Sequence, residues 1–314
     1  QWYGGMGMVV IAVAVLPFLG VGGMDLMSAE APGPSGDRLT PRVSETAKRL
    51  WFTYVLFTIG VSVTLIAIPG QSVYDAIAHG LTTIATGGFS PHADSIGTFD
   101  SGAVELAIIV GMVLGGTNFA LHWRAVTGDR LAYWRDPEFR TYLNLLIGAS
   151  VLVIALLWLD AGLAITEAIR AGVFNVVAIA TSTGYGSAQG AGSSGDFALW
   201  VPAAQLVLLF LMVVGSSSGS TAGGLKVMRL QILLAHSIRS VRRSQQPHAV
   251  MPVKHGTSAV NDNIVSRMTG FFLLYLLLVL AGRVGLAALG NGLHEAVSGT
   301  IGALGNTGLP LGQA

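Results

Sequence analysis

Long apolar segments alternate along the chain with shorter apolar stretches and glycine-rich connections. A helix needs about 20 apolar residues to cross the roughly 30 Å hydrocarbon core of a bilayer. Segments of about that length lie near residues 2–19, 47–68, 102–122, 141–159, 198–235 (interrupted) and 264–289. Three stretches are too short to span, and each runs into a Gly-rich turn: 72–86, 165–181 and 293–304. We therefore predict an all-α membrane protein with short re-entrant helices between its spanning helices.

The overall composition supports a membrane protein. Of the 314 residues, 52% are hydrophobic and 11% are charged, whereas soluble domains carry about 25% charged residues. The net charge of +1 gives no support for nucleic-acid binding. The sequence contains no cysteine, which excludes disulfides, thiolate metal sites and cysteine nucleophiles within it. Because residues 1–19 lack the basic region of a signal peptide, we expect a fragment that begins inside a larger protein.

The positions of positive charge predict which connections are cytoplasmic. Four, four and seven lysines and arginines fall respectively before the second span, between the third and fourth spans, and between the interruption and the last span. These stretches hold 15 of the 17 lysines and arginines in the chain. By the positive-inside rule the three stretches are cytoplasmic, and the short helices enter from the outside.

The short apolar stretches share a start and an end, which predicts three internal repeats. Each begins with an acid followed by alanine, at Asp75, Glu167 and Glu295, and acids suit the positive end of a helix dipole. Each ends in a small polar turn: Thr86-Gly87-Gly88, Ser182-Thr183-Gly184 or Asn306-Thr307-Gly308. The acid lies 13, 17 and 13 residues before the last glycine of its turn. The expected unit is a span, a re-entrant helix, a turn and a second span.

The chemistry of the turns favours a monovalent cation. A short helix that enters from outside points the negative end of its dipole toward the membrane centre. The turn that follows exposes backbone carbonyls and hydroxyls, and such oxygens replace the water shell of K⁺ in channel filters. Glycine at the third position lets the carbonyl direction alternate without a Cβ penalty. No carboxylate lies in the turns, which argues against a divalent-selective site.

Some local features predict packing. Ser72 precedes Asp75 at the spacing of a capping box. Gly111 and Gly115 match the small-xxx-small pattern, for which we expect ordinary packing within the molecule. Phe89 and Tyr185 follow the first two turns, and their apolar bodies suit packing behind those turns.

The fifth apolar segment is interrupted by a polar stretch that we name the Gly/Ser loop. It consists of Gly215, Ser216, Ser217, Ser218, Gly219, Ser220, Thr221, Ala222, Gly223 and Gly224. Unpaired backbone amides cost several kcal/mol in lipid, so this stretch must line protein or a watery cavity. Broken helices at membrane depth are typical of ion-transport proteins, in which they bind ions or gate their path.

Two alternative functions are compatible with the Gly/Ser loop. It formally matches the G-x-S-x-G nucleophile elbow, which would suit an intramembrane serine hydrolase. That hypothesis lacks a histidine base in the same segment and leaves the repeats unexplained. Broken helices also form the binding sites of secondary transporters with inverted repeats. The repeats here keep one orientation, which suits a pore better.

These motifs resemble the Trk/Ktr/HKT superfamily of potassium transporters, most closely its bacterial TrkH-like branch. The matching stretches are 1–8, 82–90, 180–186, 215–226 and 305–308. The resemblance implies four M1–pore helix–M2 units arranged pseudo-fourfold around a central ion pore. It implies that K⁺ binds at the residues of the three turns, as a selectivity filter, and that the Gly/Ser loop gates the path beneath them.

The resemblance also implies boundaries and partners. Residues 1–45 would end the first repeat and form a cytoplasmic connection, followed by repeats at 46–139, 140–255 (with the broken M2) and 256–314. The first filter turn would lie before Gln1 and the last M2 after Ala314. The implied function is potassium uptake, not an enzyme activity, with K⁺ as the transported ion and no bound cofactor. The implied protein is a multi-pass homodimer of the inner (cytoplasmic) membrane with an RCK-type, TrkA-like nucleotide-binding regulatory subunit.

Overall fold

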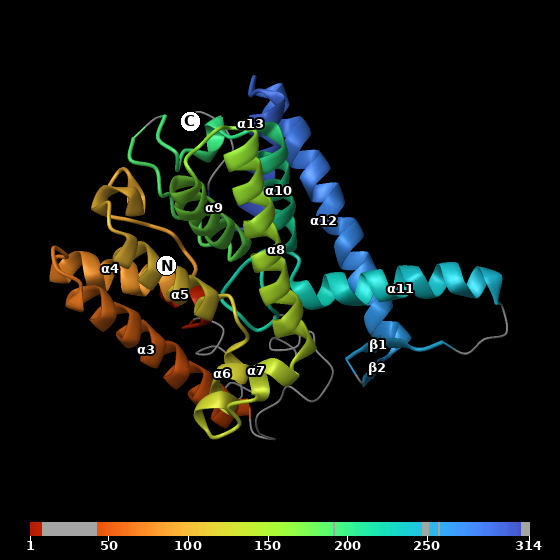
Figure 1. The fold of residues 1–314 in the computed structure, drawn as a ribbon. Coiled ribbons are helices and arrows are strands. Elements are labelled where there is room, and N and C mark those ends of the chain that lie inside the picture. Colours follow the sequence, from red (N-terminus) through yellow and green to blue (C-terminus); the bar gives the residue numbers. More distant parts are fainter. Residues whose placement is uncertain (8–42, 191, 247–250, 257, 309–314) are drawn as a thin grey trace.

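A computed structural model describes residues 1–7, 43–190, 192–246, 251–256 and 258–308, and it is mostly helical (Figure 1). The span expected at 2–19 lies largely outside these ranges. Its first residues form a short π-helical element, η1 (Tyr3–Gly7), which packs against the first long helix.

Three helices are long and apolar enough to cross a membrane in the described part of the chain. They are α3 (Val43–Ala67), α8 (Pro137–Leu159) and α12 (Asp262–Ala288), at the positions predicted for three of the spans. The start of α8 shows why it begins where it does. The Asp136 side chain accepts a hydrogen bond from the Phe139 N–H, and Pro137 occupies the first helical turn, where it is tolerated.

The three short helices also lie where the sequence predicts them. They are α4 (Val73–Ile84), α9 (Ile165–Ala180) and α13 (Leu293–Leu304). At the start of α4 the Ser72 hydroxyl accepts a hydrogen bond from the Asp75 N–H, as the capping spacing predicts. At the start of α13 the Glu295 carboxylate accepts one from the Gly292 N–H. Polar side chains thus satisfy backbone groups that the first turn of a helix leaves unpaired.

The span predicted at 102–122 is wrong as a single helix. The chain forms α5 (Gly102–Gly115) and α6 (Phe119–Val126), which are bent by 101° relative to each other. The Asn118 side chain accepts a hydrogen bond from the Ala120 N–H and so starts a new helix. The sequence stays mostly apolar through this point, so hydropathy does not reveal the break, whereas the cap at Asn118 does. Gly111 of α5 packs closely on Thr83 and Val61, which confirms the expectation of packing within the molecule.

The Gly/Ser loop joins α10 (Pro202–Val214) to α11 (Val227–Gln245), so the predicted interruption is confirmed. Figure 1 shows α11 extending away from the helical body as an arm. A hairpin of β1 (Val253–His255) and β2 (Ser258–Val260) packs against this arm, with Val253 opposite Val260. The all-α expectation did not include this hairpin, whose two valines form a small apolar cluster with Met228 and Ile232 of α11.

Three further short elements lie in connections: η3 (Ser95–Phe99), α7 (Ala132–Arg135) and η4 (Phe197–Leu199). They lead the chain between the longer helices. The Asp196 side chain begins η4 by accepting a hydrogen bond from the Ala198 N–H.

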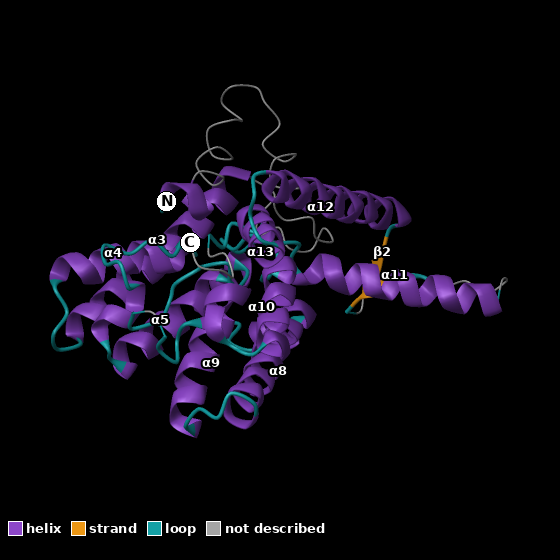
Figure 2. Cartoon of the chain, turned by 90° about the horizontal axis from the view of Figure 1, so that it is seen from above, coloured by secondary structure: helices purple, strands orange, loops and turns teal. Residues whose placement is uncertain are grey.

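The helices follow a repeated packing order (Figures 1 and 2). Each long helix packs against the short helix that follows it: α3 on α4, α8 on α9 and α12 on α13. Helix α5 contacts both α4 and α9, and α10 contacts both α9 and α13. Each of these helices therefore lies between the short helix of its own repeat and that of the next.

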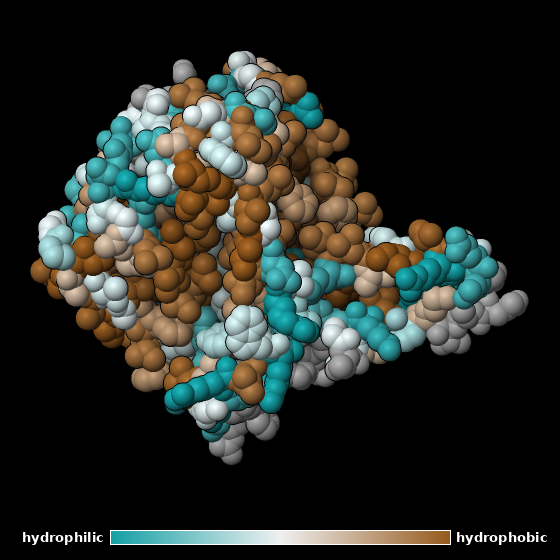
Figure 3. All heavy atoms as spheres, viewed as in Figure 1, coloured by the Kyte–Doolittle hydropathy of each residue, from teal (hydrophilic) through white to brown (hydrophobic). Residues whose placement is uncertain are grey.

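Apolar side chains cover much of the surface of the helical body, whereas polar ones gather along α11 (Figure 3). On helix α12, for example, Leu277, Leu280 and Val284 are each more than half exposed. Exposed apolar area on this scale is typical of a surface that meets lipid or another protein. The fold is therefore that of an all-α membrane protein, as predicted.

Candidate functional site

The three small polar turns share one backbone conformation. The first residue of each turn is left-handed, with φ of 48° at Thr86, 50° at Ser182 and 56° at Asn306. The third is a glycine with positive φ: 72° at Gly88, 75° at Gly184 and 75° at Gly308. Left-handed residues other than glycine are uncommon, and threonine is among the less favourable types. The same unusual conformation at three equivalent positions indicates a repeated structural unit.

The hydrogen bonds that end the three short helices are also equivalent. The N–H of the first turn residue donates to the carbonyl three residues before it, and the N–H of the second donates to the carbonyl five residues before it. The pairs are Thr86 to Thr83, Gly87 to Thr82, Ser182 to Ile179, Thr183 to Ala178, Asn306 to Ala303 and Thr307 to Gly302, at 2.8–3.2 Å. The repeat found in the sequence is thus also a repeat of backbone geometry.

The 86–88 and 182–184 turns lie against each other. A Cβ placed on Gly88 would lie 1.9 Å from the Thr183 carbonyl oxygen. Tyr185 is fully buried behind them, and its hydroxyl lies 2.5 Å from the Thr82 hydroxyl oxygen, which confirms the expected packing of this ring. The same expectation is wrong for Phe89, which is 70% exposed.

A hollow of about 400 Å³ opens beside these two turns. Gly88, Phe89, Gly184 and Gly186 contribute to its lining, so residues of both turns reach the same open space. Phe89 lines this hollow instead of packing behind its turn, where the imidazole of His79 contacts the ring of Tyr185.

The Gly/Ser loop is buried beneath the same helix ends. Thr221 lies against the C-terminal end of α4, where its hydroxyl is 2.9 Å from the Ile84 carbonyl oxygen and 3.0 Å from that of Gly115. The hydroxyl of Thr86, in the first turn, donates to the Thr221 oxygen at 3.1 Å. The loop therefore contacts the 86–88 turn directly.

The loop also contacts the helix ends beside the other two turns. The Ser216 hydroxyl donates to the Ala180 carbonyl at the end of α9 (3.0 Å), and the Gly223 N–H donates to the Ser182 hydroxyl (2.5 Å). A Cβ on Gly223 would lie 2.0 Å from the Gly305 carbonyl oxygen, beside the 306–308 turn. The loop thus contacts the 86–88 and 182–184 turns and the residue before the 306–308 turn, which lie far apart in the sequence.

The nucleophile-elbow hypothesis places its serine at Ser217, which is 1% exposed. Its hydroxyl has no hydrogen-bond partner within the described ranges. The buried His122 ring is bonded to the Leu114 carbonyl and the Tyr133 hydroxyl. The geometry therefore provides no activated serine at this position.

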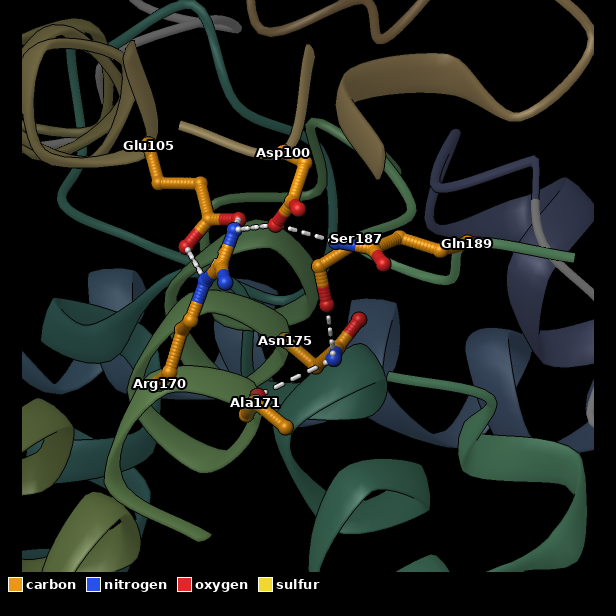
Figure 4. Close-up of polar contacts among 7 residues, drawn as sticks. All are labelled: Asp100, Glu105, Arg170, Ala171, Asn175, Ser187 and Gln189. Carbon is orange, nitrogen blue, oxygen red and sulfur yellow. Dashed lines mark hydrogen bonds and ion pairs between the residues drawn. The ribbon is translucent and has the colours of Figure 1, made fainter. Parts of the chain in front are cut away.

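The structure also reveals a polar cluster between α9 and α5 to which the sequence analysis assigned no role (Figure 4). Arg170 of α9 donates from Nε to both Glu105 oxygens at 2.8 and 3.0 Å, and from Nη2 to Asp100 at 2.9 Å. Gln189 donates to the same Asp100 oxygen at 2.5 Å. The bonds from Arg170 and Gln189 hold the pKa of the Asp100 carboxyl below its usual range.

One signal in the sequence could have identified this cluster. Arg170 is a lone cation in an apolar re-entrant helix, and such a charge needs a partner. To the right of Arg170 in Figure 4, Asn175 donates to the Ala171 carbonyl (3.0 Å) and the Ser187 hydroxyl (2.9 Å), which fixes the chain after the 182–184 turn. The described ranges contain no group of three or more His, Asp or Glu side chains suited to a metal ion.

Comparison with known proteins identifies relatives along the whole chain. Residues 1–314 match the family described as TrkH, cation transport protein. The chain is 42% identical over 317 residues to the Trk system potassium uptake protein TrkH of Halomonas elongata and covers 64% of it. It is 38% identical over 315 residues to the TrkH of Escherichia coli K12, again covering 64% of that protein.

A solved structure gives the same relationship. The fold matches the crystal structure of the potassium transporter TrkH from Vibrio parahaemolyticus with a TM-score of 0.83 and 35% identity. The match covers 100% of this chain and 63% of that chain. The chain therefore spans somewhat less than two thirds of the length of these relatives. It belongs to the TrkH family of cation transport proteins.

Proposed function

We propose that this chain forms part of a potassium uptake protein in which K⁺ passes through the three turns. The observation that carries the proposal is the convergence of three turns with one backbone conformation on a single buried loop. The printed names of the relatives, which describe potassium uptake, support the choice of ion.

The ion would be bound by backbone and hydroxyl oxygens of the turns. Residues 86–88, 182–184 and 306–308 carry no charged side chain. Each follows the C-terminal, negative end of a short helix, which favours a cation. Carbonyl oxygens suit a monovalent ion that must bind and leave quickly. K⁺ is the transported ion in this proposal, and no further cofactor is required.

The Gly/Ser loop would be the gate. It contacts the ends of α4 and α9 and the residue before the 306–308 turn, which supports a position across the path from the turns toward the basic connections. Its positive-φ glycines, among them Gly215, Gly219 and Gly224, allow backbone conformations that other residues resist. A loop of this kind can change its conformation without breaking a spanning helix.

The proposed assembly extends beyond the chain described here. Residues 1–45, 46–139, 140–255 and 256–314 would belong to four successive repeats, with the first filter turn and the last M2 contributed by further sequence. The protein would lie in the cytoplasmic membrane as a homodimer with a TrkA-like, RCK-type regulatory subunit. The term Trk system in the names of the relatives supports the presence of partner subunits.

Uptake of ⁸⁶Rb⁺ into proteoliposomes that hold the full-length protein tests the proposed function. We expect uptake that excess K⁺ blocks and excess Na⁺ does not, because only K⁺ matches Rb⁺ in size and dehydration. Empty liposomes provide the baseline. Folded protein that takes up no ⁸⁶Rb⁺, with and without a cytoplasmic regulatory subunit, would overturn the proposal, and so would equal competition by Na⁺.

A further inference from the structure

The buried carboxylate of Glu138 is not explained by its own helix. Glu138 lies in the first turn of α8 and is 2% exposed. The start of α8 is already capped by Asp136, whose side chain accepts the Phe139 N–H at 2.7 Å. A carboxylate removed from water requires hydrogen bonds or a counter-charge. Its partners must therefore lie on other elements.

Those partners are two backbone N–H groups, one within the Gly/Ser loop and one just after it. Glu138 Oε1 accepts a hydrogen bond from the Ser218 N–H at 2.6 Å, within the Gly/Ser loop. The same oxygen accepts one from the Met228 N–H at 3.1 Å, in the first turn of α11. One oxygen atom of an unbroken spanning helix thus holds both the loop and the helix that follows it.

The contact with α11 has a second electrostatic basis. Helix α11 begins at Val227 after Lys226, which has φ of +75° and provides no side-chain cap. The first N–H groups of a helix lack partners in the helix, and its N-terminus favours negative charge. The Glu138 side chain supplies the acceptor from a neighbouring helix. It thereby fixes where the chain resumes a helical path.

Other contacts of the loop reach the short helices instead of α8. Ser216, Thr221 and Gly223 bond to the ends of the short helices and to their turns. Glu138 bonds to the loop from α8. The buried Ser217 hydroxyl is left without a partner in the described structure, which is unfavourable by about 1–3 kcal/mol. The loop is therefore held in a position that does not satisfy all of its own groups.

We propose that Glu138 is a positioning residue that anchors the Gly/Ser loop in the conformation seen here. The inference rests on the proposed function, in which this loop is the gate of the ion path. When the carboxylate is removed, the Ser218 and Met228 N–H groups lose their acceptor, and the loop is released from α8. The loop then leaves the path more often.

The test compares ⁸⁶Rb⁺ uptake by the full-length protein carrying Glu138→Gln or Glu138→Ala with uptake by the unmodified protein. Glu138→Ala is expected to raise the initial rate about tenfold, equivalent to about 1.4 kcal/mol. Glu138→Gln keeps an acceptor oxygen without the charge and should give a smaller rise. Block by K⁺ and tolerance of Na⁺ should not change, because the turns are untouched. Glu45→Gln, in the first turn of α3, is the matched control and should leave the rate unchanged.

A second readout reports the loop itself. In a full-length, cysteine-free background, Ser217→Cys is expected to react with a membrane-impermeant thiol reagent several times faster when Glu138→Gln is also present. Equal reaction rates with and without Glu138→Gln would overturn the proposal, even if the alanine variant fails to fold. Reduced K⁺-over-Na⁺ discrimination would also overturn it, because the residue would then support the turns.

A shortened Gly/Ser loop separates failure of the anchor from failure of the gate. If shortening raises ⁸⁶Rb⁺ uptake and folded Glu138 variants do not, the anchor proposal alone is wrong. If neither change raises uptake by a protein that is otherwise active, the loop is not the gate and both proposals are wrong.

Discussion

At the residue scale, a single missing β-carbon determines how closely two of the turns approach each other. Gly88 combines φ of +72° with a position at which a Cβ would lie 1.9 Å from the Thr183 carbonyl oxygen. Real Cβ atoms essentially never come closer than 3.0 Å to such an atom, so any side chain must displace that carbonyl. The residue therefore affects the geometry of a neighbouring repeat as well as its own.

Replacing Gly88 with alanine should relax ion selectivity. The Thr183 carbonyl is one of the proposed K⁺ ligands, and its displacement should lower the preference for K⁺ over Na⁺ in blocking ⁸⁶Rb⁺ uptake by about tenfold or more, or about 1.4 kcal/mol. Gly148→Ala is the matched control, because a Cβ there meets no atom within 4 Å. Unchanged selectivity in folded Gly88→Ala protein would remove the 86–88 and 182–184 turns from the proposed filter.

At the scale of elements, two breaks in the membrane-embedded helices satisfy each other. The Phe119 N–H at the α5–α6 bend donates to the Gly219 carbonyl, and the Ser217 N–H donates to the Gly116 carbonyl, both at 3.1 Å. The Thr221 N–H donates to a further carbonyl of the bend at 3.2 Å. Irregular backbone is tolerated at membrane depth only when its amides find partners in the protein. Each break supplies the partners that the other lacks.

Thr221→Val should increase ion flux at constant selectivity. Valine keeps the volume of threonine but removes the hydroxyl that bonds the Ile84 and Gly115 carbonyls. Losing these bonds should destabilise the closed loop by about 1–2 kcal/mol and raise ⁸⁶Rb⁺ uptake several-fold. Thr64→Val is the matched control and should not change uptake, because the exposed Thr64 hydroxyl bonds to the Gly60 carbonyl of its own helix. A lower uptake in folded Thr221→Val protein would contradict a gating role for the contact.

The repeats and the main break could be predicted because their signals are local in sequence. The Gly/Ser loop interrupts an apolar run, and the acids at Asp75 and Glu295 mark helix starts by side-chain chemistry. The second break was missed because residues 102–122 remain apolar through Gly115 and Gly116. The amides of the predicted loop, however, already required partners on another element.

The conformation of the turns could be predicted only in part. Glycine at Gly88, Gly184 and Gly308 suggests positive φ, which the structure has at all three positions. The left-handed Thr86 could not be anticipated, since threonine is stiff and disfavours this region. Two hydrogen bonds at the end of α4, from Thr86 to Thr83 and from Gly87 to Thr82, accompany this conformation. They form only in the folded helix and cannot be inferred from the residue types.

At the scale of the whole molecule, the cluster around Arg170 connects two repeats. Arg170 belongs to α9 of the third repeat, whereas Glu105 and Asp100 belong to α5 and its approach in the second. Glu105 is 4% exposed, so its carboxylate needs the hydrogen bonds of this partner. The three hydrogen bonds between Arg170 and Glu105 hold the outer halves of the repeats together.

Arg170→Ala should destabilise the folded protein. The change leaves the buried Glu105 carboxylate unpaired, which we expect to cost about 1–3 kcal/mol because Arg170 itself is partly exposed. Thermal unfolding of the full-length protein in detergent measures the shift. Arg124→Ala breaks an exposed pair with Asp129 and should change stability by about 0–1 kcal/mol. Equal shifts for the two variants would show that the cluster does not hold the repeats together.

The position of α10 between two short helices has a mechanical consequence. This helix contacts α9 on one side and α13 on the other, and its own C-terminal end continues into the Gly/Ser loop. It therefore packs against the short helices of two neighbouring repeats and is at the same time joined directly to the proposed gate. A tilt of α10 would change its contacts with both α9 and α13. In the proposed function, binding of an ion at the turns and opening of the loop are therefore energetically coupled through this one helix.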